Sequence, residues 1–270
     1  MRLTPAQLEQ YDRDGFLILP DLFAPAEIER LRQELVRLGN VEAEGVIKEK
    51  SGAIRTIFRV HDEESPTASD AFHALARCPR MLAPAQAVLR DPDLYIHHSK
   101  CNLKAAIDGD IWAWHQDYGY WQNDGFRAPD FVTTMVAIDP ATEIGGCLYL
   151  IPGSHKLGRI EPEWDDKTTS YATWVVPKAR MLEIMDRHPD PVPITGAPGT
   201  AVMFHPNILH ASGHNLSKRA RWHVFMVYCR VANRPQDVPN PRPEWVRSRK
   251  WAPLRMGNDA ALVRPAVAAE

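Results

Sequence analysis

The sequence is poor in cysteine and has no long apolar run. Only four of its 270 residues are cysteine. Cys78, Cys101, Cys147 and Cys229 stand far apart, with no CxxC pair that would suggest a zinc knuckle or a disulfide framework. Reduced core cysteines fit this spacing and indicate a cytoplasmic protein. No stretch approaches the length of a membrane span, and the polar start of the chain lacks the apolar segment of a signal peptide.

The chain also lacks an excess of charge of either sign. Its 32 Lys and Arg residues and 34 Asp and Glu residues give a formal net charge of -2. A nearly neutral chain offers no electrostatic attraction for nucleic acid or for an anionic membrane surface. We therefore expect a small-molecule substrate and neither a nucleic acid nor a membrane partner. The sequence leaves open whether the protein is a monomer or a homodimer.

Helical patterns are concentrated in the first 90 residues. Thr4 is a typical N-cap for a helix that ends at Gly15, and the strand-like FLILP follows. A second helix begins at Pro25, and its apolar face is formed by Ile28, Leu31, Leu35 and Leu38. Residues 52–60 have strand character, and 68–90 reads as helical sequence interrupted by two prolines.

From residue 94 onward the chain consists of short β-rich runs separated by Gly, Pro, Asn and Asp. Such a series predicts an antiparallel sandwich or barrel. A charged insert from about 158 to 195, containing the helical stretch KARMLEIMDRH, interrupts the series and is typical of a lid or pocket wall. The last segment is rich in proline and basic residues, and Trp245 and Trp251 are candidates to anchor it to the body of the domain.

Two side chains in the run WAWHQDYGYW are candidate metal ligands. His115 and Asp117 stand two residues apart, so on a β-strand both would project from the same face. Two imidazoles and one carboxylate on one face of iron(II) leave positions open for a chelating cosubstrate and dioxygen. A single His-x-Asp also arises by chance, and His188-Pro189-Asp190 is an instance whose central proline argues against a strand.

The third ligand is expected downstream, in FHPNILHASGHNLSKRARWHVF. His210 follows an apolar strand, Ser212 comes two residues later, and Arg221 lies 11 residues beyond His210. A hairpin would bring Arg221 back beside the metal strand. Its planar fork suits the far carboxylate of 2-oxoglutarate. His205 is the competing candidate for the third ligand.

Taken together, these motifs resemble the phytanoyl-CoA dioxygenase family of iron(II)- and 2-oxoglutarate-dependent oxygenases, particularly its ectoine hydroxylase-like bacterial branch. The resemblance covers most of the chain. It is carried by the stretches YDRDGFLILPDLF, LYIHHSKCNLK, WAWHQDYGYWQNDG, GGCLYLIPGSHKLGRI and FHPNILHASGHNLSKRAR. One departure is His214-Asn215, where relatives commonly carry Pro-Asn after the Ser-Gly of the second motif.

The resemblance implies a set of site residues. The iron(II) ligands, which are also the catalytic residues, would be His115, Asp117 and His210. The 2-oxoglutarate cosubstrate would be held by Arg221, Ser212, Asn102 and Thr134. The substrate pocket would be lined by His98, Lys100, Trp121, Phe204 and Phe225. This mixture of cationic, polar and aromatic side chains suggests a small anionic or zwitterionic substrate.

The resemblance also implies a fold and an activity. We expect one mainly β (α+β) domain over 1–270, a double-stranded β-helix or jelly roll of about eight core strands. Helical support would span about 1–90, the core about 94–232, and a proline-rich extension 233–270. The expected reaction hydroxylates an unactivated C–H bond with dioxygen and 2-oxoglutarate, releasing succinate and carbon dioxide. The carboxylate at Asp117 speaks against a halogenase, whereas desaturation or ring closure would use the same ligands.

Two other classes of protein remain open from the sequence. A metal-dependent cupin-like isomerase, or a non-catalytic small-molecule-binding jelly roll, could share the fold without needing Arg221. A carbohydrate-binding jelly roll would use surface aromatics and would leave the His and Asp set without a role.

Overall fold

The computed structural model describes residues 1–109, 111–168 and 172–263. Strands of the larger sheet are β1 Phe16–Leu19, β2 Val46–Lys48, β3 Ile54–Phe58, β4 Leu94–Lys104, β6 Phe131–Ala137, β11 Ala201–Phe204 and β13 Arg221–Arg230. Strands of the smaller sheet are β5 Trp112–His115, β7 Leu148–Leu150, β10 Val192–Ile194 and β12 His210–Ser212. Their orders are β1-β11-β6-β13-β4-β3-β2 and β10-β7-β12-β5, with every neighbouring pair antiparallel.

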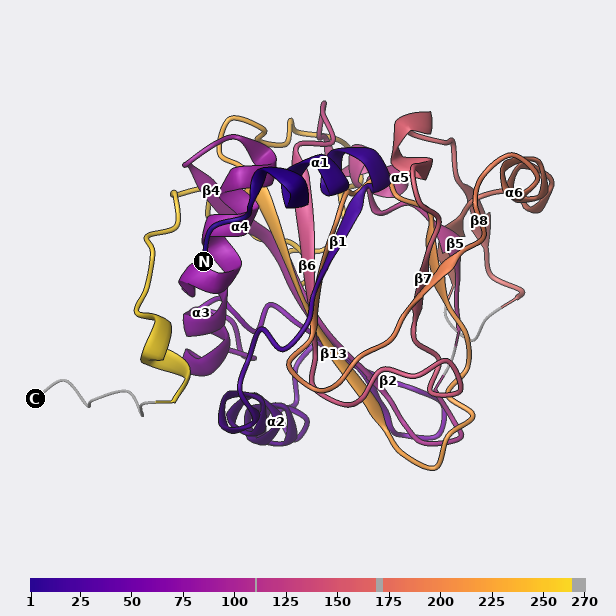
Figure 1. Ribbon diagram of the computed structural model, residues 1–270. Helices are drawn as coiled ribbons and strands as arrows, with labels where there is room; N and C mark the ends of the chain where they lie inside the picture. Colours follow the sequence, from indigo (N-terminus) through magenta and orange to yellow (C-terminus); the bar gives the residue numbers. More distant parts are fainter. Residues whose placement is uncertain (110, 169–171, 264–270) are drawn as a thin grey trace, which may run out of the picture.

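Eight of these strands form a jelly roll. In chain order they are β4, β5, β6, β7, β10, β11, β12 and β13, and they divide equally between the two facing sheets (Figure 1). Apolar side chains from both sheets meet between them, among them Met135, Leu148, Leu150, Phe204 and Phe225. The expected mainly β double-stranded β-helix of about eight core strands is confirmed.

Helices cover the outer face of the seven-stranded sheet (Figure 1). They are α1 Pro5–Asp14, α2 Pro25–Leu38, α3 Asp70–Arg77 and α4 Pro79–Leu89. Their apolar side chains pack against Val132 and Val136 of β6 and Met226 of β13. Within the described residues, no helix combines the length and the apolar character needed to cross a membrane.

The first two helices follow their sequence signals. Thr4 caps α1 by accepting from the backbone of Gln7, and Gly15 ends the helix at φ 82°, a left-handed conformation that glycine adopts without strain. The predicted apolar face of α2 is buried, with Ile28, Leu31, Leu35 and Leu38 at most 3% exposed. Helical periodicity therefore located this supporting layer correctly.

The two prolines of segment 68–90 have different effects. Pro79 separates α3 from α4 and occupies the first position of α4, where a missing N–H costs nothing. Pro84 lies inside α4, and the helix continues to Leu89. The expectation that both prolines interrupt the helix was therefore wrong for Pro84.

The insert after residue 158 is shorter than expected. It contains a hairpin of β8 Glu163–Asp165 and β9 Thr173–Val175, followed by α6 Lys178–Met185 at the predicted position. Val176 donates to the carbonyl of Trp114 at 2.9 Å, which ties the insert to β5. The predicted limit of 195 includes β10, which belongs to the four-stranded sheet because it pairs with β7.

The C-terminal segment returns along the first half of β4, which β3 leaves unpaired. Ser248 donates to the carbonyl of His97 at 2.6 Å, and Leu254 donates to that of Leu94 at 2.7 Å. The ring of Trp245 packs edge-on against Phe58 at 5.5 Å between centroids, as expected of an anchor. The remaining helical turns are α5 Asp117–Trp121, η1 Gln122–Asp124, η2 Ser154–Leu157 and η3 Asp259–Leu262. Residues 264–270 of the extension lie outside the described residues.

Candidate active site

Three buried side chains converge between the sheets. His115 ends β5 and His210 begins β12, and the two are direct partners in the sheet register. Their ring centroids are 4.1 Å apart. Oδ1 of Asp117 lies 3.8 Å from Nε2 of each ring, and one ligand atom from each residue falls within 4.8 Å of the others. This arrangement can hold one metal ion.

Asp117 reaches the cluster by a different route from the one expected. The sequence interpretation placed His115 and Asp117 on one strand, but β5 ends at His115 and Asp117 is the first residue of α5. Gln116, extended at φ -113° and ψ 132°, joins the two elements. The change from strand to helix, rather than strand alternation, therefore brings the carboxylate beside the imidazoles.

Buried hydrogen bonds fix this junction. The amide nitrogen of Gln116 donates to the carbonyls of Gly158 at 2.8 Å and Asn207 at 2.7 Å, and its amide oxygen accepts from the backbone of Ile160 at 2.7 Å. Gln116 is 2% exposed, so losing these bonds would leave buried polar atoms unpaired. The side chain between the two candidate ligands therefore serves to hold them in place.

Backbone carbonyls orient both imidazoles. Nδ1 of His115 donates to the carbonyl of Ala113 at 2.7 Å, and Nδ1 of His210 donates to that of Ile208 at 3.0 Å. With the proton on Nδ1, each Nε2 presents a lone pair to the centre of the cluster. Burial lowers the pKa of His115 to about 3, with a further lowering from His210, and burial also lowers the pKa of His210. Both rings are therefore neutral, as metal binding requires.

The carboxylate of Asp117 stays ionised despite its burial. Burial alone would raise its pKa, but the interactions with the His210 imidazole and with the charge of Lys100 outweigh this effect and lower it. Thr133 and Tyr120 donate weakly to the two carboxylate oxygens, each at 3.5 Å. The cluster thus combines one anion and two neutral nitrogen donors.

Arg221 and Ser212 lie in the same cavity as the cluster, but on facing sheets. The predicted hairpin between their strands was wrong, because β12 pairs with β5 and β7, whereas β13 pairs with β4 and β6. The interior between the sheets brings the two residues together instead. With His115, Asp117 and His210 they line a narrow cavity of about 20 Å³.

Arg221 is a buried cation without a carboxylate partner among the described residues. It is 3% exposed, and it donates to Nδ1 of His223 at 3.0 Å and to the carbonyl of Gly146 at 2.6 Å. Its Nε has no acceptor within the described part of the chain. Burial lowers its pKa to about 10, which still leaves the guanidinium charged at neutral pH. A buried charge of this kind is costly unless an anion binds beside it.

The two further residues assigned to the cosubstrate have different positions. Asn102 lines the cavity, and its Oδ1 accepts from Thr56 at 3.1 Å. Thr134 pairs with Met226 on the helix-facing side of β6, so it points away from the cavity. Its neighbour Thr133 faces Asp117 instead. The assignment of Thr134 was therefore out of phase by one residue along the strand.

The five residues expected in the substrate pocket form two groups. Lys100, Phe204 and Phe225 line the cavity, and Nζ of Lys100 lies 5.3 Å from the ring centroid of Phe225. His98 and Trp121 lie deeper, with ring centroids 5.3 Å apart, and do not line it. Both nitrogens of His98 and Nε1 of Trp121 are buried and have no partner among the described residues.

Arg242, from the C-terminal segment, is a residue near the site that the sequence interpretation missed. Its guanidinium pairs with the buried carboxylate of Asp124 at 2.6 Å, contacts Nε2 of His97 at 3.2 Å and lies 5.2 Å from the ring centroid of Tyr120. Its charge also contributes to lowering the pKa of Asp117. Only its place in a basic, proline-rich segment could have drawn attention to it.

The competing candidates lie elsewhere. His205 packs against His155 with ring centroids 5.2 Å apart, and its Nδ1 accepts from the backbone of Asn207 at 3.0 Å. Among the described residues, the candidate metal cluster contains His210 and not His205. Nδ1 of His214 contacts the carbonyl of Gly109 at 3.2 Å, so this residue joins two loops.

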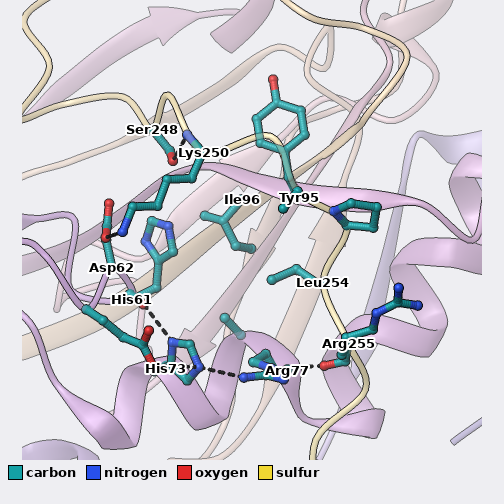
Figure 2. Close-up of a pocket in the computed structure, with 14 residues that line it drawn as sticks. His61, Asp62, His73, Arg77, Tyr95, Ile96, Ser248, Lys250, Leu254 and Arg255 are labelled. Carbon is teal, nitrogen blue, oxygen red and sulfur yellow. Dashed lines mark hydrogen bonds and ion pairs between the residues drawn. The ribbon is translucent and has the colours of Figure 1, made fainter.

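A larger cavity, of about 260 Å³, lies between α3 and the C-terminal segment (Figure 2). Its buried carboxylate, Asp62, is already paired with Arg59 and with Lys250, the latter at 2.8 Å. His73 contacts Arg77 at 2.8 Å and the carbonyl of His61 at 3.2 Å, as the dashed lines in Figure 2 show. These groups satisfy one another, so the narrower cavity between the sheets is the better candidate for chemistry.

A jelly roll carrying two imidazoles, one carboxylate and a buried arginine in its interior defines a non-haem iron oxygenase of the 2-oxoglutarate-dependent class. More specifically, the chain belongs to the phytanoyl-CoA dioxygenase (PhyH) family, whose family model matches residues 11–222. The family membership expected from the sequence is thus confirmed.

Relatives and solved structures agree with this assignment. L-proline trans-4-hydroxylase of Streptomyces griseoviridis is 33% identical over 260 residues, which cover 91% of this chain and 92% of that protein. Ectoine dioxygenase of Nocardia farcinica is 30% identical over 262 residues, covering 92% and 86%. The crystal structure of EctD from S. alaskensis with 2-oxoglutarate and 5-hydroxyectoine matches with a TM-score of 0.81 at 30% identity, covering 94% of this chain and 87% of that one.

Proposed function

We propose that the protein is an iron(II)- and 2-oxoglutarate-dependent dioxygenase in which His115, Asp117 and His210 bind the metal. The observation that carries this proposal is the convergence of three ligand atoms within 4.8 Å, in the same cavity as Arg221, a cation with no carboxylate partner among the described residues. EctD, a relative at 30% identity, has been crystallised both with iron and with 2-oxoglutarate. The substrate would be a small molecule hydroxylated at an unactivated C–H bond.

The donor set fits iron(II). Two neutral imidazoles and one carboxylate on one side of the ion leave positions for a chelating keto acid and for dioxygen. When bound, iron supplies the activation of dioxygen that is coupled to decarboxylation of 2-oxoglutarate into succinate and carbon dioxide. The carboxylate of Asp117 would fill a coordination position that a halogenase needs for chloride, and this favours hydroxylation.

The protein's own groups would bind and orient the cosubstrate. Arg221 and Ser212 would anchor its distal carboxylate, the arginine through charge-assisted hydrogen bonds. Asn102 would add an amide donor, because Thr56 already occupies its amide oxygen. The low exposure of these residues, 3 to 6%, keeps water from competing for the same groups.

A small anionic or zwitterionic substrate suits the remaining walls. Lys100 and Arg242 supply positive charge close to Asp117, and Phe225 supplies an apolar wall. His98 and Trp121 would offer the substrate their buried ring nitrogens, which have no partner among the described residues. Relatives named for L-proline and ectoine act on small polar molecules, which supports the same class here.

The alternative of a cupin-like isomerase or a non-catalytic binding protein fits less well. Neither function needs a buried guanidinium without a carboxylate partner, which is costly unless an anion binds to it.

The domain organisation and location are further parts of the proposal. We propose that residues 1–270 form a single domain, because the helices pack on the sheet and the C-terminal segment returns to β4. Four free, buried cysteines support residence in the reducing cytoplasm, as a monomer or homodimer.

An anaerobic titration tests the proposal. Iron(II) is added to metal-free protein, followed by 2-oxoglutarate, and the weak visible charge-transfer band of the chelate is recorded. We expect the band in the wild type and a need for far more 2-oxoglutarate in Arg221→Ala. Bound iron without a band would contradict the oxygenase proposal and favour the isomerase or binding protein.

A further inference from the structure

The guanidinium of Arg221 is held by two neutral acceptors. Nη1 donates to Nδ1 of His223 at 3.0 Å, and Nη2 donates to the carbonyl of Gly146 at 2.6 Å. These bonds fix the plane of the group from two sides. Nε stays available, since it has no acceptor among the described residues.

His223 is placed to support Arg221 and has no other evident role. It follows two residues later on β13, so both side chains point into the jelly roll, and it lies opposite Asn102 of β4. The side chain is completely buried. Because arginine can only donate, Nδ1 must carry the lone pair and Nε2 the proton.

This tautomer is held by the surroundings. Burial, followed by the charges of Arg221 and Lys104, keeps the pKa of His223 well below its usual range. The ring is therefore a neutral acceptor at neutral pH. Its Nε2 has no acceptor among the described residues, so within that part of the chain the ring interacts mainly through Nδ1.

We propose that His223 is a positioning residue for 2-oxoglutarate: by accepting from Nη1 it holds the Arg221 guanidinium in the orientation that receives the distal carboxylate. This inference rests on the proposed function. A bidentate match between guanidinium and carboxylate needs a fixed plane. An acidic residue in place of His223 would also fix the plane, but it would form an ion pair and compete with the cosubstrate. A neutral imidazole orients the cation and leaves its charge available.

A matched pair of variants tests this role. In His223→Asn the side-chain oxygen stands the same number of bonds from the backbone as Nδ1, so it can still accept from Arg221. In His223→Gln the amide stands one bond further out, at the place of Nε2. Binding of 2-oxoglutarate is measured by calorimetry on the Mn(II)-loaded proteins, which separates binding from turnover. We expect His223→Asn to bind nearly as the wild type does and His223→Gln to bind about tenfold more weakly.

A second ligand distinguishes a positioning role of His223 from a general structural disturbance of the site. 2-Oxobutyrate keeps the keto acid end but lacks the distal carboxylate, so its binding should be the same in wild type and both variants. Equal 2-oxoglutarate affinity in Asn and Gln variants would overturn the inference. So would a Gln variant that weakens both ligands to the same extent, because His223 would then be structural. If Arg221→Ala loses 2-oxoglutarate while His223→Gln does not, only the positioning role fails. A wild type that does not bind 2-oxoglutarate removes the proposed function and this inference with it.

Discussion

Nζ of Lys104 donates to Oγ of Ser212 across 3.0 Å and so joins β4 of one sheet to β12 of the other. Nζ also donates to the carbonyl of Gly213. Ser212 lines the cavity that holds Arg221, and Lys104 itself is 5% exposed. One lysine thus connects the two walls of the jelly roll next to the proposed cosubstrate site.

Replacing this lysine should affect both stability and cosubstrate binding. Lys104→Met leaves Ser212 and Gly213 without their donor, and we expect a loss of about 2 kcal/mol in the free energy of unfolding. A few-fold weaker binding of 2-oxoglutarate should accompany it, because the Ser212 hydroxyl is no longer oriented. Urea unfolding and calorimetry measure the two effects. Lys48→Met, at an exposed position, is the control and should change neither; an equal effect in both variants would contradict the prediction.

Asp117→Ala should remove iron binding without unfolding the protein. The substitution deletes the single anionic donor of the cluster, while His115 and His210 keep their backbone hydrogen bonds. We expect iron(II) affinity to fall at least about a hundredfold and turnover to disappear. Metal titration and circular dichroism check the two parts. Wild-type iron affinity in this variant would exclude Asp117 as a ligand.

The junction residue Gln116 should matter almost as much as a ligand. Gln116→Leu removes three hydrogen bonds that fix the path between His115 and Asp117. Since supporting groups of this kind typically change metal affinity 10- to 100-fold, we expect a loss of about that size. The same titration applied to Gln122→Ala, an exposed glutamine a few residues away, provides the comparison. Matching affinities in the two variants would be evidence against the proposed support.

The C-terminal segment should be stabilised by the pair of Arg242 and Asp124. Arg242→Met leaves a carboxylate that is 1% exposed without its partner, and we expect a loss of about 3 kcal/mol in unfolding free energy. Asp124→Asn combined with Arg242→Met should recover part of this loss, because no buried charge remains unpaired. Urea unfolding of the single and double variants measures the coupling. Additive effects would indicate that the two residues act independently.

The free energy of unfolding of the metal-free protein should decrease as the pH is lowered below about 6.5. Burial, the largest cause in each case, lowers the pKa of His61, His115 and His205 to about 3. The unfolded chain binds these protons near pH 6.5, whereas the folded chain binds them only near pH 3. Lowering the pH across this window therefore favours unfolding, by up to about 1.4 kcal/mol per pH unit for each histidine. Unfolding in urea at pH 7 and at pH 5 measures the slope.

One substitution tests whether buried neutral histidines cause this pH dependence of the unfolding free energy. His205 packs against His155 away from the metal cluster, so His205→Phe can remove one depressed histidine without touching a proposed ligand. The variant should lose less stability than the wild type between pH 7 and pH 5. An unchanged slope would mean that His205 is not neutral in the folded protein.

Much of the site follows from local sequence. His115, Asp117 and His210 stand in short motifs whose spacing is itself the signal, and Arg221 follows at a recognisable distance. The β-rich runs of 94–232 predicted an antiparallel sandwich or barrel, and the family resemblance implied a jelly roll. The sequence could not predict how Asp117 comes to lie beside the two histidines. The strand-to-helix change at Gln116 depends on contacts with Gly158 and Asn207, which are distant in the sequence.

The errors have physical reasons. Thr133 and Thr134 are chemically alike and adjacent, so only the pairing of β6 with β13 decides which one faces Asp117. Arg242 lies 21 residues after Arg221 in a segment without periodic structure. Its position depends on a buried ion pair with Asp124. Neither register nor a long-range ion pair can be read from one sequence.

The proposed metal ligands belong to β5, α5 and β12, on the side of the four-stranded sheet, whereas Arg221 belongs to the seven-stranded sheet facing it. Facing sheets pack about 10 Å apart. Side chains of both sheets reach into this space and leave only a narrow cavity between them. A dicarboxylic keto acid held by both the metal and the guanidinium would have to span that remaining distance, so the packing of the two sheets would limit the length of its carbon chain. An oxo acid one carbon shorter would have to give up one of its two ends.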